Sequence, residues 1–244
     1  MAPLLGAFDR HRLRLLGRRP PGRLLDAGAG RGRFVATARA AGWDAHGLEP
    51  SARGVRAAAE AYAVALEQAS IAQATAAEGA YDAVTLWHVL EHLDAPEEAL
   101  RRTGTWLAPG GVLLVGVPNL ASAQARLGGP RWYHLDLPRH RTHFTVAGLH
   151  ALLGRAGLEP LRTHHVLAEH NPFGMWQSLV SRATPTPSWL YLALKRTAPV
   201  RAADVLPTLA ALPLAPAAAA LELAAGLARR GGTVAVLARA RLSP

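Results

Sequence analysis

Two spacings of apolar residues alternate along most of the chain, from residue 23 to about residue 168. Short apolar runs, typical of buried strands, are separated by longer stretches that have the spacing of an amphipathic helix. The expected strands cover residues 23–27, 44–48, 63–67, 81–87, 112–117, 159–168 and 231–240, and the expected helices cover residues 34–41, 52–62, 97–107 and 145–155. This alternation predicts an α/β fold, with a seven-stranded, mostly parallel sheet and helices on both faces.

The two ends of the chain depart from this alternation. Residues 4–16 have the pattern of a short amphipathic helix, which would end before the Pro20-Pro21 pair. Residues 171–188 are rich in turn formers and aromatics, and residues 202–228 are nearly all Ala, Leu and Pro. We therefore expect an N-terminal helical arm over residues 1–22, a core over 23–170, an apolar helical insertion over 171–230, and the last core strand and tail over 231–244.

The apolar segment 205–228 is long enough to suggest a membrane span. Its three prolines, Glu222 and the weak hydrophobicity of alanine argue against one. A helical cap over the active site is the favoured interpretation. The alternative is peripheral membrane contact through residues 205–230, with Arg229 and Arg230 toward the headgroups.

Composition narrows the classes of function. Half of the residues are hydrophobic and 18% are charged, which predicts a sizeable core. The absence of cysteine excludes disulfides, thiolate metal sites and cysteine nucleophiles, and it fits the reducing cytoplasm. Asp9 and Arg10 stand where a secretory signal would need apolar residues. We expect a cytoplasmic protein, peripheral at the inner face of the membrane in the alternative interpretation.

The net charge of +10 raises the question of a nucleic-acid partner. Its source is almost entirely arginine, with Lys195 as the only lysine, and most of the arginines are scattered. A basic stripe with interleaved aromatics, as single-stranded nucleic-acid sites have, is missing. We expect no nucleic-acid partner, and the sequence leaves the oligomeric state open.

The sharpest motif runs from Asp26 to Gly32, between an expected strand and an expected helix. Ligands of open α/β sheets bind at the carboxyl ends of strands, and glycines let them approach the main chain closely. Gly28, Gly30 and Gly32 read G-x-G-x-G, whereas a dinucleotide loop reads G-x-G-x-x-G. With Asp26 two residues earlier, the loop resembles motif I of the class I S-adenosylmethionine-dependent methyltransferases, which have a Rossmann-like fold.

The resemblance extends over about residues 23–168 and the last strand. Residues 81–84 and 107–117 resemble the family's fourth and fifth strands. It implies S-adenosylmethionine as cofactor, with Asp26 and the three glycines in its binding loop and Glu49 bonding both ribose hydroxyls. Ser70 stands where the family usually has an aspartate that bonds the adenine amino group, so either Ser70 accepts that bond or the alignment there is off. Trp87 and His88 would line the cofactor pocket.

Residues 88–92 read H-x-x-E-H, the signature of inverted zinc proteases. That chemistry needs both histidines on one helix, whereas His88 ends an expected strand and Pro96 shortens the segment after it. The stretch also resembles the ubiquinone-biosynthesis O-methyltransferases, some of which bind a divalent cation here. His88, Glu91 and His92 are thus candidate metal ligands, but structural hydrogen bonding by Glu91 and His92 is the favoured role.

Residues 132–144 come after the fifth family strand and contain three histidines. Together with Pro118-Asn119, they resemble a large bacterial methyltransferase subfamily, in whose fold this loop overhangs the cofactor's sulfur. Histidine suits a general base because its pKa is close to the operating pH. His143 is the preferred base, since it directly precedes an expected helix, while His140 and His134 are alternatives. At least one of the three is expected to be structural.

We therefore predict an enzyme that methylates a small-molecule acceptor, with a hydroxyl as the preferred site. A non-catalytic cofactor-binding scaffold or regulatory partner is the alternative, and only turnover separates the two. An RNA methyltransferase is disfavoured, because Thr85-Leu86-Trp87-His88 stands where base or protein amino-group methylation would call for an Asn/Asp-Pro-Pro-aromatic motif.

Overall fold

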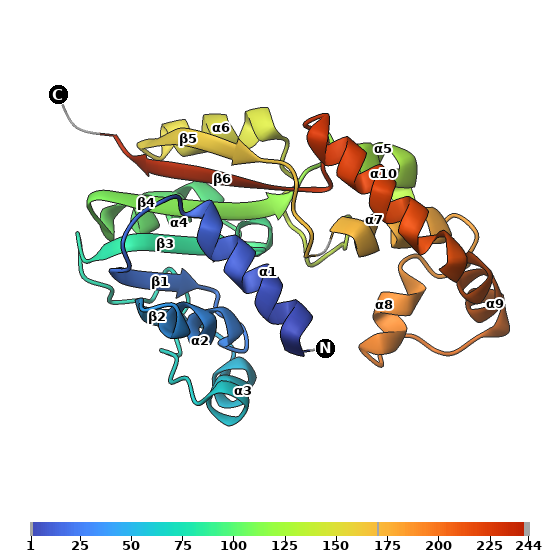
Figure 1. Cartoon of the computed structure of the whole chain (residues 1–244), viewed down its shortest axis with the longest axis horizontal. Helices are drawn as coiled ribbons and strands as arrows, with labels where there is room; N and C mark the ends of the chain where they lie inside the picture. The colour runs from blue at the N-terminus through green and yellow to red at the C-terminus, as the bar shows by residue number, and fades with distance from the viewer. Residues whose placement is uncertain (1, 170, 242–244) are drawn as a thin grey trace. The chain divides into compact units, whose positions relative to one another are not determined.

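A six-stranded mixed sheet forms the frame of the protein (Figure 1), as described over residues 2–169 and 171–241 by a computed structural model. Its strands are β1 (Arg23–Ala27), β2 (Asp44–Leu48), β3 (Tyr81–Trp87), β4 (Leu107–Pro118), β5 (Leu158–His164) and β6 (Thr233–Ala240), in the order β2-β1-β3-β4-β6-β5. β1 pairs in parallel with β2 and β3, and β3 with β4, while β5 and β6 are antiparallel. The predicted Rossmann-like fold class is confirmed, with one strand fewer than expected.

The strand predicted over residues 63–67 is wrong. Only Glu67 pairs there, through an isolated bridge to Leu48. Glu67 donates its N–H to Gly47 O and accepts from Glu49 N, both at 3.0 Å. The helix before it ends at Ala63 in the left-handed conformation (φ 52°), so the chain reaches the sheet edge for a single residue.

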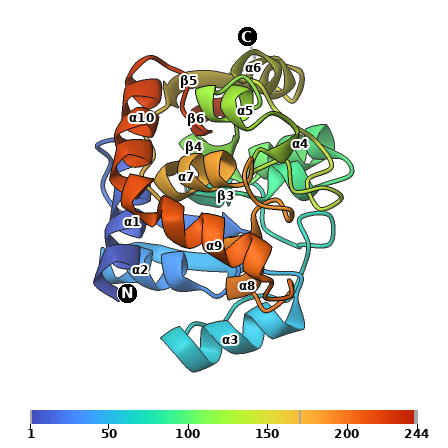
Figure 2. The same cartoon turned by 90° about the vertical axis from the view of Figure 1, so that its right-hand side faces the viewer.

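The first of two compact units holds residues 2–117, 147–164 and 235–241. Its helices are α1 (Ala2–Leu15), α2 (Arg33–Ala40), α3 (Ala52–Tyr62), the 3-10 turn η1 (Leu90–His92), α4 (Pro96–Thr105) and α6 (Val146–Arg155). α1 and α2 lie on one face of the sheet, and α4 and α6 on the other (Figure 2). The middle of β3 and the end of β4 are buried without interruption, as expected for strands covered on both faces.

The second compact unit holds residues 118–146 and 165–234. Its helices are α5 (Ala123–Gly128), η2 (Gly129–Arg131), α7 (Asn171–Val180), α8 (Trp189–Leu194), α9 (Ala202–Ala211), η3 (Leu212–Leu214) and α10 (Ala215–Leu227). Met175, Trp176 and Val180 of α7 form an apolar core with Ala218 of α10. The insertion expected over residues 171–230 is helical. Met1 and residues 242–244, at the ends of the predicted arm and tail, lie outside the described residues.

A buried polar network joins distant parts of this second unit. The Gln124 side chain donates to Asn171 O (3.1 Å) and to a Glu222 carboxylate oxygen (3.2 Å), and it accepts from Trp132 Nε1 (3.0 Å). The other Glu222 oxygen accepts from Gly232 N at 2.6 Å. Burial raises the Glu222 pKa to about 7, because the charged form loses its hydration.

Candidate functional site

The loop after β1 has a backbone conformation that favours glycine at three positions. Gly28, Gly30 and Gly32 have φ values of 86°, 57° and 73°, in the left-handed region that side chains disfavour. The N–H groups of Gly28 and Ala29 both donate to Leu48 O at 2.8 Å, which folds the loop over the end of β2. The loop therefore lies at the carboxyl ends of parallel strands, where ligands of such sheets bind.

The three glycines differ in what surrounds them. A Cβ at Gly28 would lie 2.3 Å from Val89 Cγ2, and one at Gly32 would lie 2.8 Å from Ala58 Cβ. A Cβ at Gly30 would meet no atom within 4 Å. Gly28 and Gly32 thus allow close packing, whereas the open space is at Gly30.

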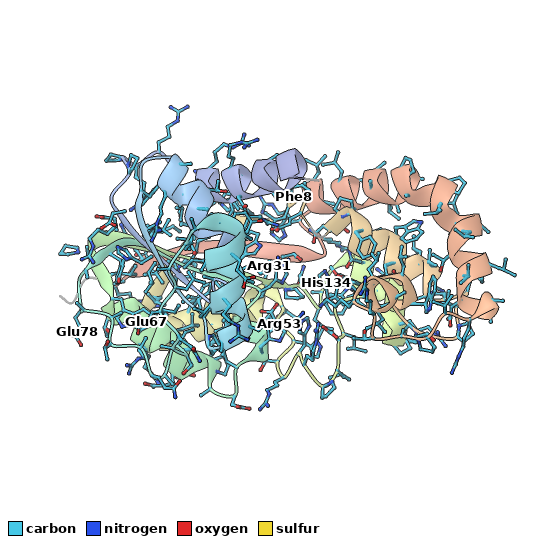
Figure 3. The ribbon with its side chains drawn as sticks, turned by 90° about the horizontal axis from the view of Figure 1, so that it is seen from below. Phe8, Arg31, Arg53, Glu67, Glu78 and His134 are labelled. Atoms are coloured by element: carbon cyan, nitrogen blue, oxygen red, sulfur yellow. The ribbon has the colours of Figure 1, made fainter. Side chains whose placement is uncertain are left out.

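Glu49 lies directly beside that open position. One carboxylate oxygen accepts from Gly30 N (2.8 Å) and the other from Ser51 N (2.9 Å). Ser51 caps α3 by accepting from Gly54 N at 3.3 Å. Each carboxylate oxygen keeps a second lone pair, so the half-buried Glu49 can also accept from two hydroxyls. The surroundings of the glycine loop, including Arg31 and Arg53, are drawn in Figure 3.

Asp26, at the head of the loop, is only 2% exposed and has a buried cationic partner. The Arg12 guanidinium of α1 donates to Asp26 Oδ1 and, at 2.7 Å, to Thr85 Oγ1. Thr85 in turn donates to the same Asp26 oxygen at 2.6 Å, and the Arg12 guanidinium carbon lies 3.7 Å from the centre of the Phe34 ring. The loop is therefore fixed to α1 by a desolvated charge pair.

Ser70 borders a cavity of about 250 Å³ in the first unit, lined also by Ile71, Leu93, Asp94 and Glu98. Its hydroxyl donates to Gln73 Oε1 at 2.8 Å. The hydroxyl oxygen keeps its lone pairs for a further donor, as the predicted adenine contact requires. That role of Ser70 stays a prediction.

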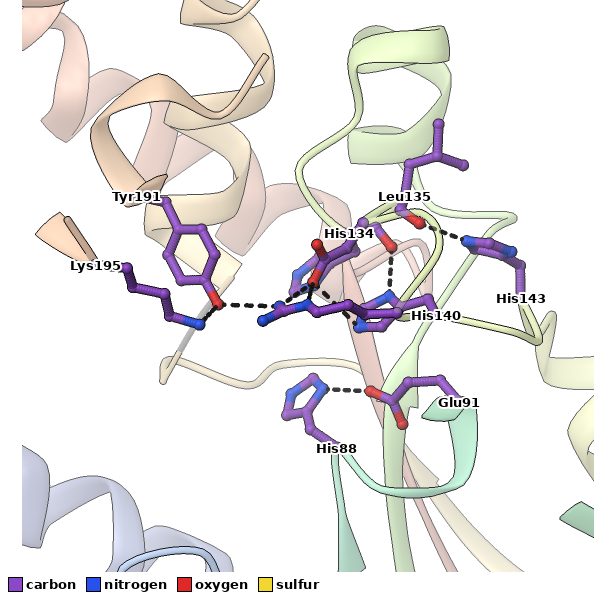
Figure 4. A network of polar contacts seen from close by, with 10 residues as sticks. His88, Glu91, His134, Leu135, His140, His143, Tyr191 and Lys195 are labelled. Carbon is purple, nitrogen blue, oxygen red and sulfur yellow. Dashed lines mark hydrogen bonds and ion pairs between the residues drawn. The ribbon is translucent and has the colours of Figure 1, made fainter. Parts of the chain in front are cut away.

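Past the end of β3 the chain turns sharply. His88 has φ 55°, which is rare for a residue with a side chain. Its Nδ1 donates to Glu91 Oε1 at 2.9 Å (Figure 4), and its ring lies edge-on to Trp87, with centroids 6.1 Å apart. Leu90–His92 form a single 3-10 turn that excludes His88. The protease geometry is therefore absent, while metal binding by His88, Glu91 and His92 stays a prediction.

The histidine-rich segment belongs to the second unit, and its own carbonyls orient two of its imidazoles (Figure 4). His140 Nδ1 donates to His134 O at 2.7 Å, and its Nε2 lies 3.8 Å from an Asp136 carboxylate oxygen. His143 Nε2 donates to Leu135 O at 2.9 Å. Of the three histidines only His143 is partly exposed, since His134 and His140 are buried.

An aromatic and polar cluster adjoins this segment. Tyr133 lies edge-on to Tyr191, with ring centroids 5.2 Å apart. The Tyr191 hydroxyl accepts from Arg139 at 3.3 Å and also from Lys195, while Arg139 pairs with Asp136. Burial raises the pKa of Tyr133, which keeps that phenol protonated.

The model of a family described as a methyltransferase domain matches residues 5–163. The chain belongs to this methyltransferase family. That membership confirms the predicted class I S-adenosylmethionine-dependent methyltransferase assignment. No curated protein matches the chain.

Several solved structures share the fold of this methyltransferase. An S-adenosylmethionine-dependent methyltransferase from Archaeoglobus fulgidus is 16% identical, with a TM-score of 0.61 over 98% of this chain and 94% of its own. The cyclase SpnF is 22% identical, with a TM-score of 0.60 over 96% and 81%. A geranyl diphosphate methyltransferase in complex with GPP and sinefungin is 18% identical, with a TM-score of 0.57 over 96% and 77%.

The residues present fit the cofactor that the family implies. The open face of Gly30 lets a ligand reach the main chain, and the Glu49 carboxylate held beside it is an acceptor for ribose hydroxyls.

The sequence did not identify Arg12 as part of the site. The spacing of residues gave a weak indication of its role. Asp9 and Arg12 stand at i and i+3, with the buried Leu16 at i+7, which places two charged residues on the buried face of α1.

Proposed function

We propose that this methyltransferase methylates a hydroxyl oxygen of a small-molecule acceptor, with His143 as the general base. The observation that carries the proposal is the 2.9 Å contact between His143 Nε2 and the carbonyl oxygen of Leu135. Because its Nε2 must hold the proton donated to Leu135 O, Nδ1 of the neutral ring has a free lone pair. A fixed, partly exposed imidazole with an available lone pair is what proton removal from a hydroxyl needs.

The other two histidines suit support roles better. His140 is buried, and its Nδ1 is engaged by the loop carbonyl of His134. The His134 ring packs between Trp132 and Tyr133, with centroids 5.6 and 4.7 Å away. Both features favour shaping of the acceptor region over proton transfer.

When bound, S-adenosylmethionine would supply a methyl group whose carbon is electron-poor because it is bonded to the positively charged sulfonium sulfur, and this C–S bond would break as the methyl group is transferred. The role that we assign to Glu49 and Gly30 is to hold the ribose, and the role of His143 is to take the hydroxyl proton at Nδ1. Proton removal leaves the acceptor oxygen able to accept the methyl carbon. A small-molecule acceptor also agrees with the names of structural relatives, such as the geranyl diphosphate methyltransferase.

Turnover with radiolabelled cofactor against a panel of hydroxylated sugars, lipids and phenols tests the proposal. On the acceptor found, His143→Ala should lower kcat by about a hundred-fold to ten-thousand-fold. Cofactor affinity, measured by calorimetry, should stay unchanged. His150→Ala is the matched control, since the His150 ring is also partly buried and hydrogen-bonded, to Thr163 on β5.

Near-normal turnover by His143→Ala on the true acceptor would place the base elsewhere. Tight cofactor binding without methylation of any acceptor would instead favour the scaffold alternative.

A further inference from the structure

One surface of the second unit is apolar over a long stretch. Between Arg201 and Arg229, every exposed residue is Ala, Leu or Pro. The exposed residues of this stretch, which we call the apolar surface, include Leu206, Leu209, Leu212, Leu221, Leu223 and Leu227, and Leu227 is 72% exposed. Large exposed apolar areas mark interaction sites rather than ordinary water-facing surface.

The two acidic residues of the stretch point inward. Asp204 is fully buried, and its oxygens accept from Thr186 N (2.9 Å) and Thr186 Oγ1 (3.1 Å). Glu222 is 4% exposed and belongs to the polar network with Gln124 and Gly232. The apolar surface therefore carries no negative charge.

Exposed basic residues flank the apolar surface in the sequence, at both of its ends. Lys195, Arg196 and Arg201 precede it and Arg229 and Arg230 come after it, all of them exposed. An uncharged leucine-rich face with a cationic border complements a bilayer that presents anionic headgroups over hydrocarbon.

A membrane span does not fit the same helices, although Ala202–Leu227 is long and apolar enough by length and composition. α9 and α10 meet at a bend at η3 (Figure 2). The inward face of α10 packs on α7, and spanning would carry Asp204 and Glu222 into hydrocarbon. Contact along the bilayer surface keeps these internal bonds.

The apolar surface also opens into a cavity of about 390 Å³ between α7, α9 and α10. All of its lining residues are apolar, among them Trp176, Leu179, Leu214 and Leu221. Trp176 Nε1 does not point a free donor into it, because that group donates to Ala211 O at 2.8 Å. Such walls suit a hydrocarbon chain and offer nothing to a polar ligand.

We propose that the apolar surface docks on an anionic phospholipid bilayer, with the leucines in the interface and the basic border on the headgroups. The inference is independent of the proposed acceptor chemistry and needs no turnover. Vesicle flotation of the full-length protein measures this binding. Phosphatidylglycerol vesicles are compared with phosphatidylcholine vesicles, at low and at high salt. Binding to the anionic vesicles that weakens with salt is the expected result.

Variants separate the contribution of the leucines to vesicle binding from that of the arginines. Leu206→Gln/Leu209→Gln/Leu223→Gln should weaken binding by about ten-fold or more, because three apolar side chains no longer enter the interface. Arg229→Gln/Arg230→Gln should weaken binding by about 25-fold at low salt, or about five-fold per arginine. Leu161→Gln is the control, since Leu161 is a 44% exposed leucine on β5. Circular dichroism melts verify that each variant is folded.

Recovery of the folded wild-type protein only in the lipid-free fraction would overturn the proposal. So would a lipid-independent dimer, seen by light scattering, that the leucine variant dissociates, since the surface would then bind a second copy of the chain.

Discussion

The Arg12–Asp26 pair gives a quantitative test of how α1 is attached to the cofactor loop. Breaking a buried ion pair by removing one partner typically costs about 3–5 kcal/mol, because the remaining charge stays buried and uncompensated. In Arg12→Met, Asp26 would keep the hydrogen bond from Thr85, and the methionine would keep part of the contact with Phe34. We therefore expect the lower end of that range, about 3 kcal/mol.

A double-mutant cycle isolates the pair from these other effects. Asp26→Asn alone should be strongly destabilising, since it leaves the Arg12 charge without its carboxylate. In the Arg12→Met background the same change should cost little, which gives a coupling of about 2 kcal/mol. Urea unfolding monitored by circular dichroism measures each corner of the cycle.

Arg10→Met is the matched control for the loss of an arginine from α1. Arg10 lies on the same helix but is exposed, so its replacement should change stability by less than about 0.5 kcal/mol. A loss below about 1 kcal/mol in Arg12→Met, with coupling near zero, would refute the idea that this pair holds α1 to the loop.

Four further measurements probe the site and the buried network. Gly30→Val should abolish S-adenosylmethionine binding in calorimetry, because its side chain would enter open space, and strain at its positive φ should lower the melting temperature. Gly28→Val should lower the melting temperature further, because its side chain also collides with Val89. Glu49→Ala should weaken that binding by about 1.5–3 kcal/mol; an unchanged affinity would remove Glu49 from the site. If His88, Glu91 and His92 bind a cation, methyltransferase activity should fall with a chelator and return with added cation. Full activity after exhaustive chelation would favour the structural hydrogen-bonding role instead. Burial raises the pKa of Glu222 from 4.5 to about 7, so the folded state binds this proton more tightly than the unfolded state. The contribution of Glu222 to stability is therefore fully present below pH 4.5 and should fall by about 3 kcal/mol as the pH rises to 7, a slope that Glu222→Gln should remove.

Local signals in the sequence account for most of the sheet and for the cofactor loop. β1, β2 and β3 have the predicted limits, because each lies between clear turns or helices. The pattern failed at residues 63–67, where apolar residues are buried without joining a ladder: Val64 and Leu66 pack inward, but only Glu67 reaches β2. Burial and strand pairing are separate properties, and periodicity detects only the first.

Partnerships between distant residues could not be predicted in the same way. Arg12 lies fourteen residues before Asp26 and seventy-three before Thr85, and nothing in α1 alone identifies either partner. Arg12 belongs to a cluster of arginines at the start of the chain, yet it is buried and supports the cofactor loop.

The buried network around Gln124 joins two segments that the sequence assigned to different parts of the protein, the histidine-rich segment and the apolar insertion. Composition separates the apolar insertion from the histidine-rich segment, because one is alanine and leucine and the other is polar. Gln124 nevertheless binds Trp132 from the second and Glu222 from the first, and a Cβ at Gly232 would lie 2.4 Å from its Nε2. A buried amide must find partners wherever the fold supplies them, since an unmade bond costs about 1–3 kcal/mol. The two segments are therefore coupled in stability, and Gln124→Leu should loosen the histidine-rich segment and α10 together, which hydrogen exchange at both would detect; loosening of one alone would contradict that coupling.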